Sequence, residues 1–165
     1  MHRHVGSLGL LLVLGLASAG CNNALDGQEV FQATLSGAEE VPARSTAAFG
    51  ATGFTVDGGT VHYSVEVRQI TGVTGSHIHI AAAGSNGPIR VSLYPGGVTN
   101  FATSPTGAIN GILLQGSFTA SELQAGISLD QLLSSMRDGN AYVNVHTSTF
   151  PGGEIRGQIR SVSVD

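Results

Sequence analysis

The sequence predicts an all-β protein, folded as a two-sheet antiparallel Greek-key sandwich with one short helical insertion before the last two strands. Three observations predict this class. Apolar and polar residues alternate along most of the chain, which is the period of a half-buried strand. The chain has 24 glycines, and clusters of them separate the alternating segments as turns would. One segment alone repeats its apolar residues with helical spacing.

Eight segments carry the strand pattern. Residues 60–68 show it most clearly, with valine or tyrosine at every second position. The glycine pair Gly58 and Gly59 just before this segment predicts a tight turn from the preceding strand. The predicted strands cover residues 29–35, 49–56, 60–68, 76–81, 89–94, 108–118, 141–147 and 154–164.

The helical segment lies between the sixth and seventh predicted strands. Its apolar residues stand at i, i+3, i+4 and i+7, at Leu129, Leu132, Leu133 and Met136. Ser128 and Gln131 have the spacing of a capping box, which predicts the helix start. Gly139 stands where a glycine commonly ends a helix.

Composition narrows the classes of partner. Charged residues make up 11 % of the chain, against about 25 % in ordinary domains. The net charge is −4 and the sequence contains no basic run. Nucleic acid is therefore not expected as a partner, because its binding rests mainly on cationic side chains meeting phosphates. With 41 % hydrophobic residues, the chain can bury a core, which argues against disorder.

The first twenty residues predict an export signal. The apolar run at residues 8–19 is shorter than the roughly 20 residues that span a bilayer, but it fits the apolar region of a signal peptide. Small residues precede Cys21, the single cysteine. We therefore expect a signal peptide at 1–20, a tether at 21–27 and one domain at 28–165.

Residues 18–21 resemble the lipobox of bacterial lipoproteins, although Ser18 stands where leucine is usual. The resemblance implies lipidation of Cys21 and a membrane-anchored protein of the cell envelope. Asn22, in place of aspartate, favours the outer membrane by similarity to enterobacterial sorting. Without lipidation, Cys21 is a leftover thiol and the protein is secreted.

Three further blocks occur in order along the domain. They are LSGAEEVP at 35–42, GSHIHI at 75–80 with NGPI at 86–89, and GNAYVNVHT at 139–147 followed by PGGEIRGQI at 151–159. With these blocks, the chain resembles the CHRD domain from about residue 30 to residue 160. The resemblance implies an exported module. Chordin, which gives the family its name, binds growth factors, but an envelope protein gives no reason to expect that partner.

Histidines form the one candidate site for chemistry. His77 and His79 stand two apart on a predicted strand, so their side chains leave the same face about 7 Å apart at Cα. His146 lies on the polar face of a later strand. If the two strands are neighbours, three imidazoles converge, which suits copper or zinc.

The surroundings of these histidines suggest supporting residues. Asn144, Glu154 and Arg156 are the candidates for orienting the histidines from a second layer. The His-x-His step is similar to the metal-binding strand of copper-zinc superoxide dismutases, which share an immunoglobulin-like sandwich. That enzyme's disulfide cannot form in a chain with one cysteine.

Other interpretations stay open at this point. Each histidine could simply hydrogen-bond a neighbouring loop and brace the sandwich, and Glu154 and Arg156 could form a structural ion pair. The sequence contains no convincing catalytic set: no serine stands in a Gly-x-Ser-x-Gly elbow, so no catalytic residue is assigned. We therefore expect a non-enzymatic envelope module that binds a protein, a glycan or a metal ion; the alternative is a copper-dependent oxidoreductase.

Overall fold

A computed structural model describes residues 28–95, 98–101 and 107–163. The all-β class is confirmed: ten antiparallel strands and one α-helix make up the regular structure of this part, apart from two short 3-10 turns. The strands in chain order are β1 (Glu29–Ser36), β2 (Phe49–Asp57), β3 (Thr60–Ile70), β4 (Val73–Ile80), β5 (Ile89–Tyr94), β6 (Val98–Phe101), β7 (Ile109–Phe118), β8 (Ala141–Thr147), β9 (Ile155–Gln158) and β10 (Arg160–Val162).

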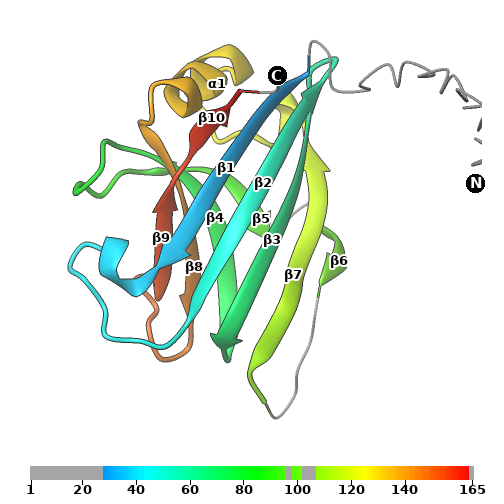
Figure 1. Ribbon diagram of the computed structural model, residues 1–165. Helices are drawn as coiled ribbons and strands as arrows, with labels where there is room; N and C mark the ends of the chain where they lie inside the picture. Colours follow the sequence, from blue (N-terminus) through cyan, green and yellow to red (C-terminus); the bar gives the residue numbers. More distant parts are fainter. Residues whose placement is uncertain (1–27, 96–97, 102–106, 164–165) are drawn as a thin grey trace, which may run out of the picture.

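The strands form two stacked layers that remain hydrogen-bonded to each other (Figure 1). The strand order is β5-β4-β8-β9-β1-β2-β3-β7-β6, and β10 also pairs with β1. One layer contains β1, β2, β3 and β7, and the other contains β4, β5, β8 and β9. Strand β1 joins the two, because it pairs with β2 along its whole length and with β9 at Ser36. The sandwich is therefore one continuous sheet folded over a shared core.

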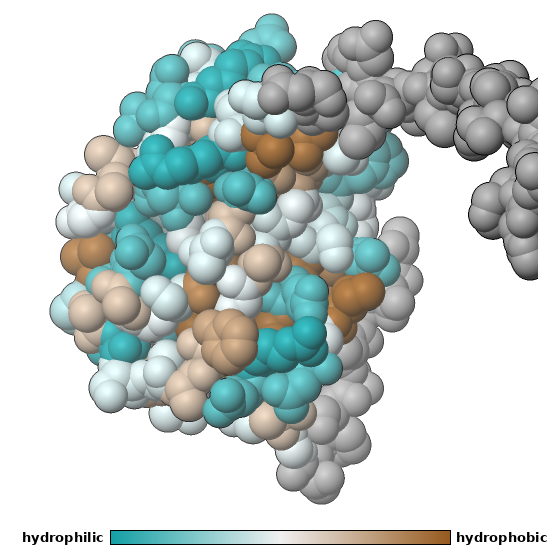
Figure 2. Space-filling model, in the orientation of Figure 1, coloured by the Kyte–Doolittle hydropathy of each residue, from teal (hydrophilic) through white to brown (hydrophobic). Residues whose placement is uncertain are grey.

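Alternation along each strand sends the apolar side chains between the layers. Phe31 of β1, Val65 of β3, Ile78 of β4 and Val143 of β8 are fully buried there. On the face seen in Figure 1, hydrophobic residues form small separate patches among hydrophilic ones (Figure 2). The apolar residues are thus gathered mainly inside, as the period of two predicts.

Helix α1 (Leu129–Arg137) closes one end of the core, where it contacts β8 and β10. Its start is as predicted: Ser128 accepts a hydrogen bond from the Gln131 amide, and the Gln131 side chain accepts one from the Ser128 amide. Leu132, Leu133 and Met136 are buried. No helix in the described part of the chain has the length and apolar character needed to cross a membrane.

Two details differ from the sequence prediction. The last predicted strand, 154–164, is divided into β9 and β10, because the chain leaves β8 after Ile159 and pairs with β1 from Arg160 onward. Ile159 lies between the two strands, and its amide donates to the Ala141 carbonyl. The short strand β6 was not predicted, since its four residues, VTNF, are too few to show a period. Cys21, the signal peptide and the tether lie outside the described residues.

Candidate metal centre

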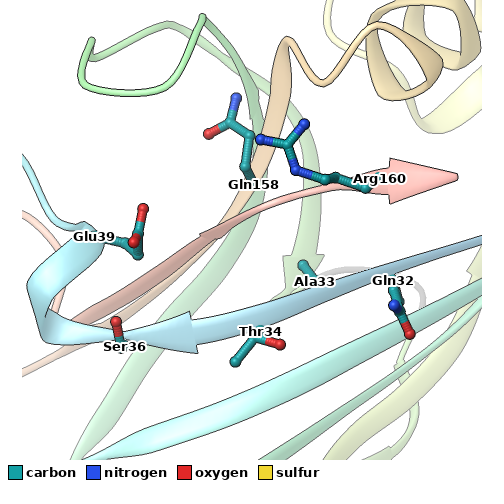
Figure 3. A pocket seen from close by; sticks show the side chains of 7 residues that line it. All are labelled: Gln32, Ala33, Thr34, Ser36, Glu39, Gln158 and Arg160. Carbon is teal, nitrogen blue, oxygen red and sulfur yellow. The ribbon is translucent and has the colours of Figure 1, made fainter.

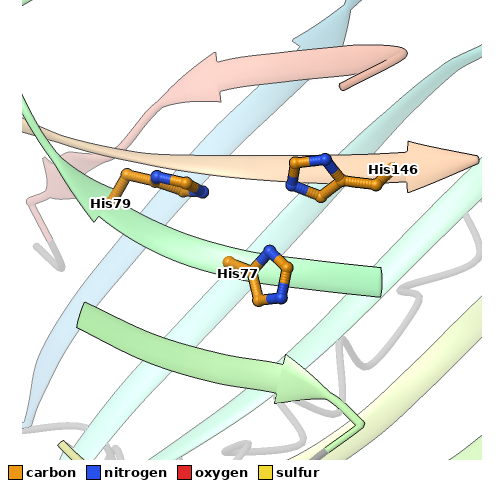
Figure 4. Close-up of side chains that lie close together, drawn as sticks. All are labelled: His77, His79 and His146. Atoms are coloured by element: carbon orange, nitrogen blue, oxygen red, sulfur yellow. The ribbon is translucent and has the colours of Figure 1, made fainter. Parts of the chain in front are cut away.

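Strands β4 and β8 bring the three predicted histidines together (Figure 4). The antiparallel pairing places Gly75 opposite His146 and Asn144 opposite His77. His77 and His79 both leave β4 on the face opposite Ile78, which belongs to the core. Each histidine offers one ring nitrogen within 4.8 Å of the others. The rings of His77 and His146 are closest, with centroids 4.8 Å apart.

Backbone carbonyls fix the orientation of two of these rings. His79 Nδ1 lies 2.9 Å from the Gly87 oxygen, and His146 Nδ1 lies 3.0 Å from the Pro151 oxygen. A carbonyl can only accept, so in each neutral ring the proton is on Nδ1 and the lone pair is on Nε2. The loop contacts expected of bracing histidines are therefore present at both positions.

Bracing leaves three nitrogens unaccounted for. The Nε2 atoms of His79 and His146 and the Nδ1 atom of His77 are buried and have no hydrogen-bond partner. A buried polar atom without a partner costs about 1–3 kcal/mol. The structure thus concentrates bare nitrogen acceptors where the three rings meet.

Burial keeps these imidazoles neutral. It lowers the pKa of His77 to about 4, and repulsion from His146 and His79 acts in the same direction. Burial also lowers the pKa of His79 and of His146, while their hydrogen bonds to Gly87 and Pro151 partly oppose that shift. Neutral imidazole is the form that binds metals, so near neutral pH no proton has to be displaced.

A glycine leaves room for the His77 ring. A Cβ added at Gly75 would stand 3.1 Å from His77 Cε1 and 3.5 Å from His77 Nε2. Since the first distance is tighter than ordinary van der Waals contact, any larger residue at position 75 would push the ring away. Gly75 therefore helps to set the spacing of the cluster.

A stack of side chains supports His79 from behind. The Tyr142 ring lies nearly parallel to the His79 ring, with centroids 4.8 Å apart, and the Arg156 guanidinium carbon lies 3.5 Å from the Tyr142 centroid. Arg156 donates to the Ser85 carbonyl (2.7 Å) and to Asn86 Oδ1 (3.1 Å). Arg156 thus holds both the ring against His79 and the loop that precedes Gly87.

The same loop returns to the stack through Tyr142. The Gly87 amide donates to the Tyr142 hydroxyl at 3.1 Å, while the Gly87 carbonyl accepts from His79. Tyr142 was not singled out in the sequence, although its place on the polar face of the predicted strand was a usable signal. Loop residues 85–87 carry no such signal, because their contacts span 55 to 71 positions of sequence.

Two of the expected supporting residues have different partners. Asn144 Nδ2 lies 3.4 Å from Glu40 Oε2. The carboxylate of Glu154 accepts from the hydroxyls of Thr46 and Thr147, both at 2.7 Å. These contacts tie the loop after β1 to β8 and β9, so Asn144 and Glu154 hold the frame around the histidines.

Glu40 is a buried acid that the sequence did not reveal as such. It is 5 % exposed, and burial raises its pKa to about 7, against the attraction of Arg156 and Arg44. Its neighbour Glu39 is exposed at the end of a 3-10 turn (Gly37–Glu39), so the two adjacent carboxylates do not share one environment. His62 is also remote in the fold: it lies exposed on β3, in the other layer.

A polar groove of about 320 Å³ lies elsewhere, along β1 (Figure 3). Its lining residues are Gln32, Ala33, Thr34, Ser36, Glu39, Gln158 and Arg160. The Gln158 amide is already engaged, since it donates to the carbonyls of Ala81 and Gly139. The groove does not include any of the three histidines.

Comparison with known proteins gives one finding. Neither a curated protein nor a solved structure matches the chain significantly. The similarity to superoxide dismutase therefore rests on the His-x-His step. A family model for the CHRD domain matches residues 31–159, which include all three motif blocks and all three histidines. The chain belongs to the CHRD domain family.

Proposed function

We propose that this CHRD domain is a non-enzymatic binding module that holds one transition-metal ion, copper or zinc, through His77, His79 and His146. The observation that carries the proposal is the set of buried, unpartnered ring nitrogens facing a common point. Imidazole nitrogen is a preferred ligand of both metals, with bonds of about 2 Å. An ion between the three rings would give the bare nitrogens a partner and would draw them together from within 4.8 Å, because two bonds of about 2 Å hold nitrogens at most about 4 Å apart.

The surroundings of the histidines support the same proposal. In metal sites, a ligating histidine usually donates its other ring N–H to a carbonyl or carboxylate, which fixes tautomer and orientation. His79 and His146 both have such a partner, in Gly87 and Pro151. Arg156 contacts the Tyr142 ring that stacks on His79, and this contact supports a positioning role for Arg156.

Metal uptake tests the proposal directly. The purified protein is incubated with Cu²⁺ or Zn²⁺, desalted and analysed for bound metal. We expect the His77→Ala/His146→Ala variant to hold one ion fewer per chain than the unmodified protein. The matched control is His62→Ala, which removes an exposed histidine from the other layer and should leave uptake unchanged. Equal uptake by the double variant would remove the proposed site.

Background binding is handled by the same comparison. Cys21, His2 and His4 can bind metal by themselves, so only the difference between the protein and its double variant reports on the cluster. Circular dichroism of each variant shows whether the sheet is retained. The single variants His77→Ala and His146→Ala provide a second test if the double variant folds poorly.

A copper-dependent oxidoreductase is the second candidate. The His-x-His step on β4 and the three-imidazole ligand set favour it, since imidazole binds copper well. Superoxide turnover by the copper-loaded protein, measured against the double variant, separates the two functions. Stoichiometric binding without turnover supports the binding module alone.

We further propose that the domain is exported and anchored through a lipid on Cys21, with the outer membrane as the favoured location. The support is the apolar run at 8–19 followed by small residues and the single cysteine. We expect Cys21→Ser to move the protein from the membrane fraction to the soluble fraction. Persistence in the membrane fraction would contradict the anchor. Besides a metal ion, the ligand classes expected for such a module are a protein or a glycan.

A further inference from the structure

The metal expected at the histidine cluster can be narrowed by counting its ligands. Among the described residues, the group of side chains able to share an ion has three members, all histidines. The nearby carbonyls of Gly87 and Pro151 already accept from ring nitrogens. Structural zinc(II) sites almost always have four protein ligands, and zinc(II) held by three histidines takes a water as its fourth ligand, whereas copper(I) accepts three nitrogen ligands in a plane without a fourth.

The charges around the histidine cluster also bear on which ion it binds. Three neutral imidazoles add no negative charge, so the full charge of a bound ion remains on the site. The nearby charge behind the cluster is also positive: Arg156 is buried against the Tyr142 ring, which stacks on His79. The cost of placing an ion in a partly buried site grows steeply with its charge. A monovalent ion therefore fits this site better than a divalent one.

We propose that His77, His79 and His146 form a three-coordinate site selective for copper(I) over zinc(II) and copper(II). This inference rests on the proposed function, since it specifies the ion that the same cluster binds. Strands β4 and β8 set the positions of the ligands, and the carbonyls of Gly87 and Pro151 hold two of the rings. A divalent ion would need an added anion or water to complete its coordination.

Competition titrations test the selectivity. Copper(I) affinity is measured under reducing, anaerobic conditions against a chromophoric copper(I) chelator, and zinc(II) affinity against a zinc indicator. The natural chain is compared with a Cys21→Ser version, because a free thiol binds copper(I) strongly. We expect copper(I) to bind about tenfold or more tightly than zinc(II) in both. His146→Ala should lose most of this binding and His62→Ala should lose none.

A second measurement reports the geometry. X-ray absorption of the copper(I)-loaded Cys21→Ser protein should show three nitrogen neighbours. Zinc(II) binding as tight as copper(I) binding, or a fourth light-atom neighbour on copper(I), would overturn the selectivity while leaving the metal-binding function in place. Loss of all difference between the protein and His146→Ala, for both ions, would overturn the proposed function itself.

Discussion

The outer faces of the two layers differ in how deeply their side chains are buried. On β3, in the first layer, burial alternates from Val61 to Val67, so that Val61, Val65 and Val67 are buried while His62 and Glu66 are exposed. On β8, in the second layer, the five residues from Ala141 to Val145 are all buried, whatever face they occupy. Loops cover the outside of β8, so polar side chains that alternation would place in water are enclosed there. The candidate metal site lies on this enclosed outer face.

Enclosure makes each buried polar group on or beside β8 and β9 costly to the folded state unless it has a partner. Arg156 has Ser85, Asn86 and the Tyr142 ring, and Glu154 has two threonine hydroxyls. On β4 and β8, the buried nitrogens without a partner lie on the histidines, and Ser76 and Asn144 each leave one buried oxygen without a partner. The outer face of β3 needs no such network, because water satisfies its side chains.

The largest difference in stability between the two layers is expected from substituting a pair of glycines, one in each layer. A Cβ at Gly157 of β9 would stand 2.0 Å from the Thr34 carbonyl oxygen, whereas a Cβ at Gly53 of β2 would meet nothing within 4 Å. We expect Gly157→Ala to lower the free energy of unfolding by about 3 kcal/mol or more, since the clash is with backbone. Gly53→Ala should change it by less than about 1 kcal/mol. Urea unfolding followed by circular dichroism measures both, and equal losses would contradict the comparison.

Two arginines give the next largest contrast. Arg156 is 1 % exposed and is held by several partners, whereas Arg68 pairs with Glu66 on the surface. Arg156→Met should cost about 3 kcal/mol of unfolding free energy, because it removes two hydrogen bonds and the cation–π contact of a buried side chain and takes a compensating charge away from Glu40. Arg68→Met should cost at most about 1 kcal/mol. Thermal and urea unfolding of the pair provide the measurement; a mild effect at position 156 would mean that the loops cover β8 without it.

Glu40 should make the fold less stable as pH rises. Its folded pKa of about 7 lies above its ordinary value of 4.5, so between these values the folded state binds more protons than the unfolded state. The stabilisation is complete below pH 4.5 and is lost as pH rises through 7, by about 2 kcal/mol. The buried histidines change stability in the opposite direction over the same range, so the Glu40 contribution is measured as the difference between the unfolding free energies of the metal-free natural chain and Glu40→Gln from pH 4.5 to 7.5. That difference should fall as pH rises, and a difference that does not change with pH would refute the assignment.

His77 should act in the opposite direction, with a smaller effect. Its pKa is about 4 when folded and 6.5 ordinarily, so the unfolded state binds more protons in this window. The stabilisation is complete above pH 6.5 and declines as pH falls towards 4, by about 1 kcal/mol, because the ring is only partly buried. His77→Asn should reduce that decline in metal-free protein, whereas His62→Ala should leave it intact. Equal effects of the two variants would count against a special environment at His77.

Much of the fold follows from local patterns. The period of two located β1, β2, β3, β5 and β8, and the capping pair Ser128 and Gln131 located the helix. The same period placed His77 and His79 on one face. Their meeting with His146 depended on the pairing of β4 with β8, which the sequence allowed but did not require.

The sequence did not predict that loops cover the outer face of β8. From the sequence, Arg156 is expected to point outward, because its neighbour Ile155 is apolar. In the fold, its contacts with Ser85 and Asn86, 71 and 70 positions away, enclose it. The sequence shows Glu40 only as one of two adjacent acids in a loop. In the fold, Asn144, Arg156 and Arg44 lie around it. Such contacts join irregular segments, in which no periodicity records which side chain turns inward.

The pairing of β1 with β10 bears on how this protein is made. Val30 lies opposite Val162, so a strand near the start of the domain finds one neighbour only in a strand near its end. A ribosome adds about 5–20 residues per second, and the sheet stays open at this seam until residues 160–162 have been made. A nascent chain therefore completes this sheet only after β10 has emerged.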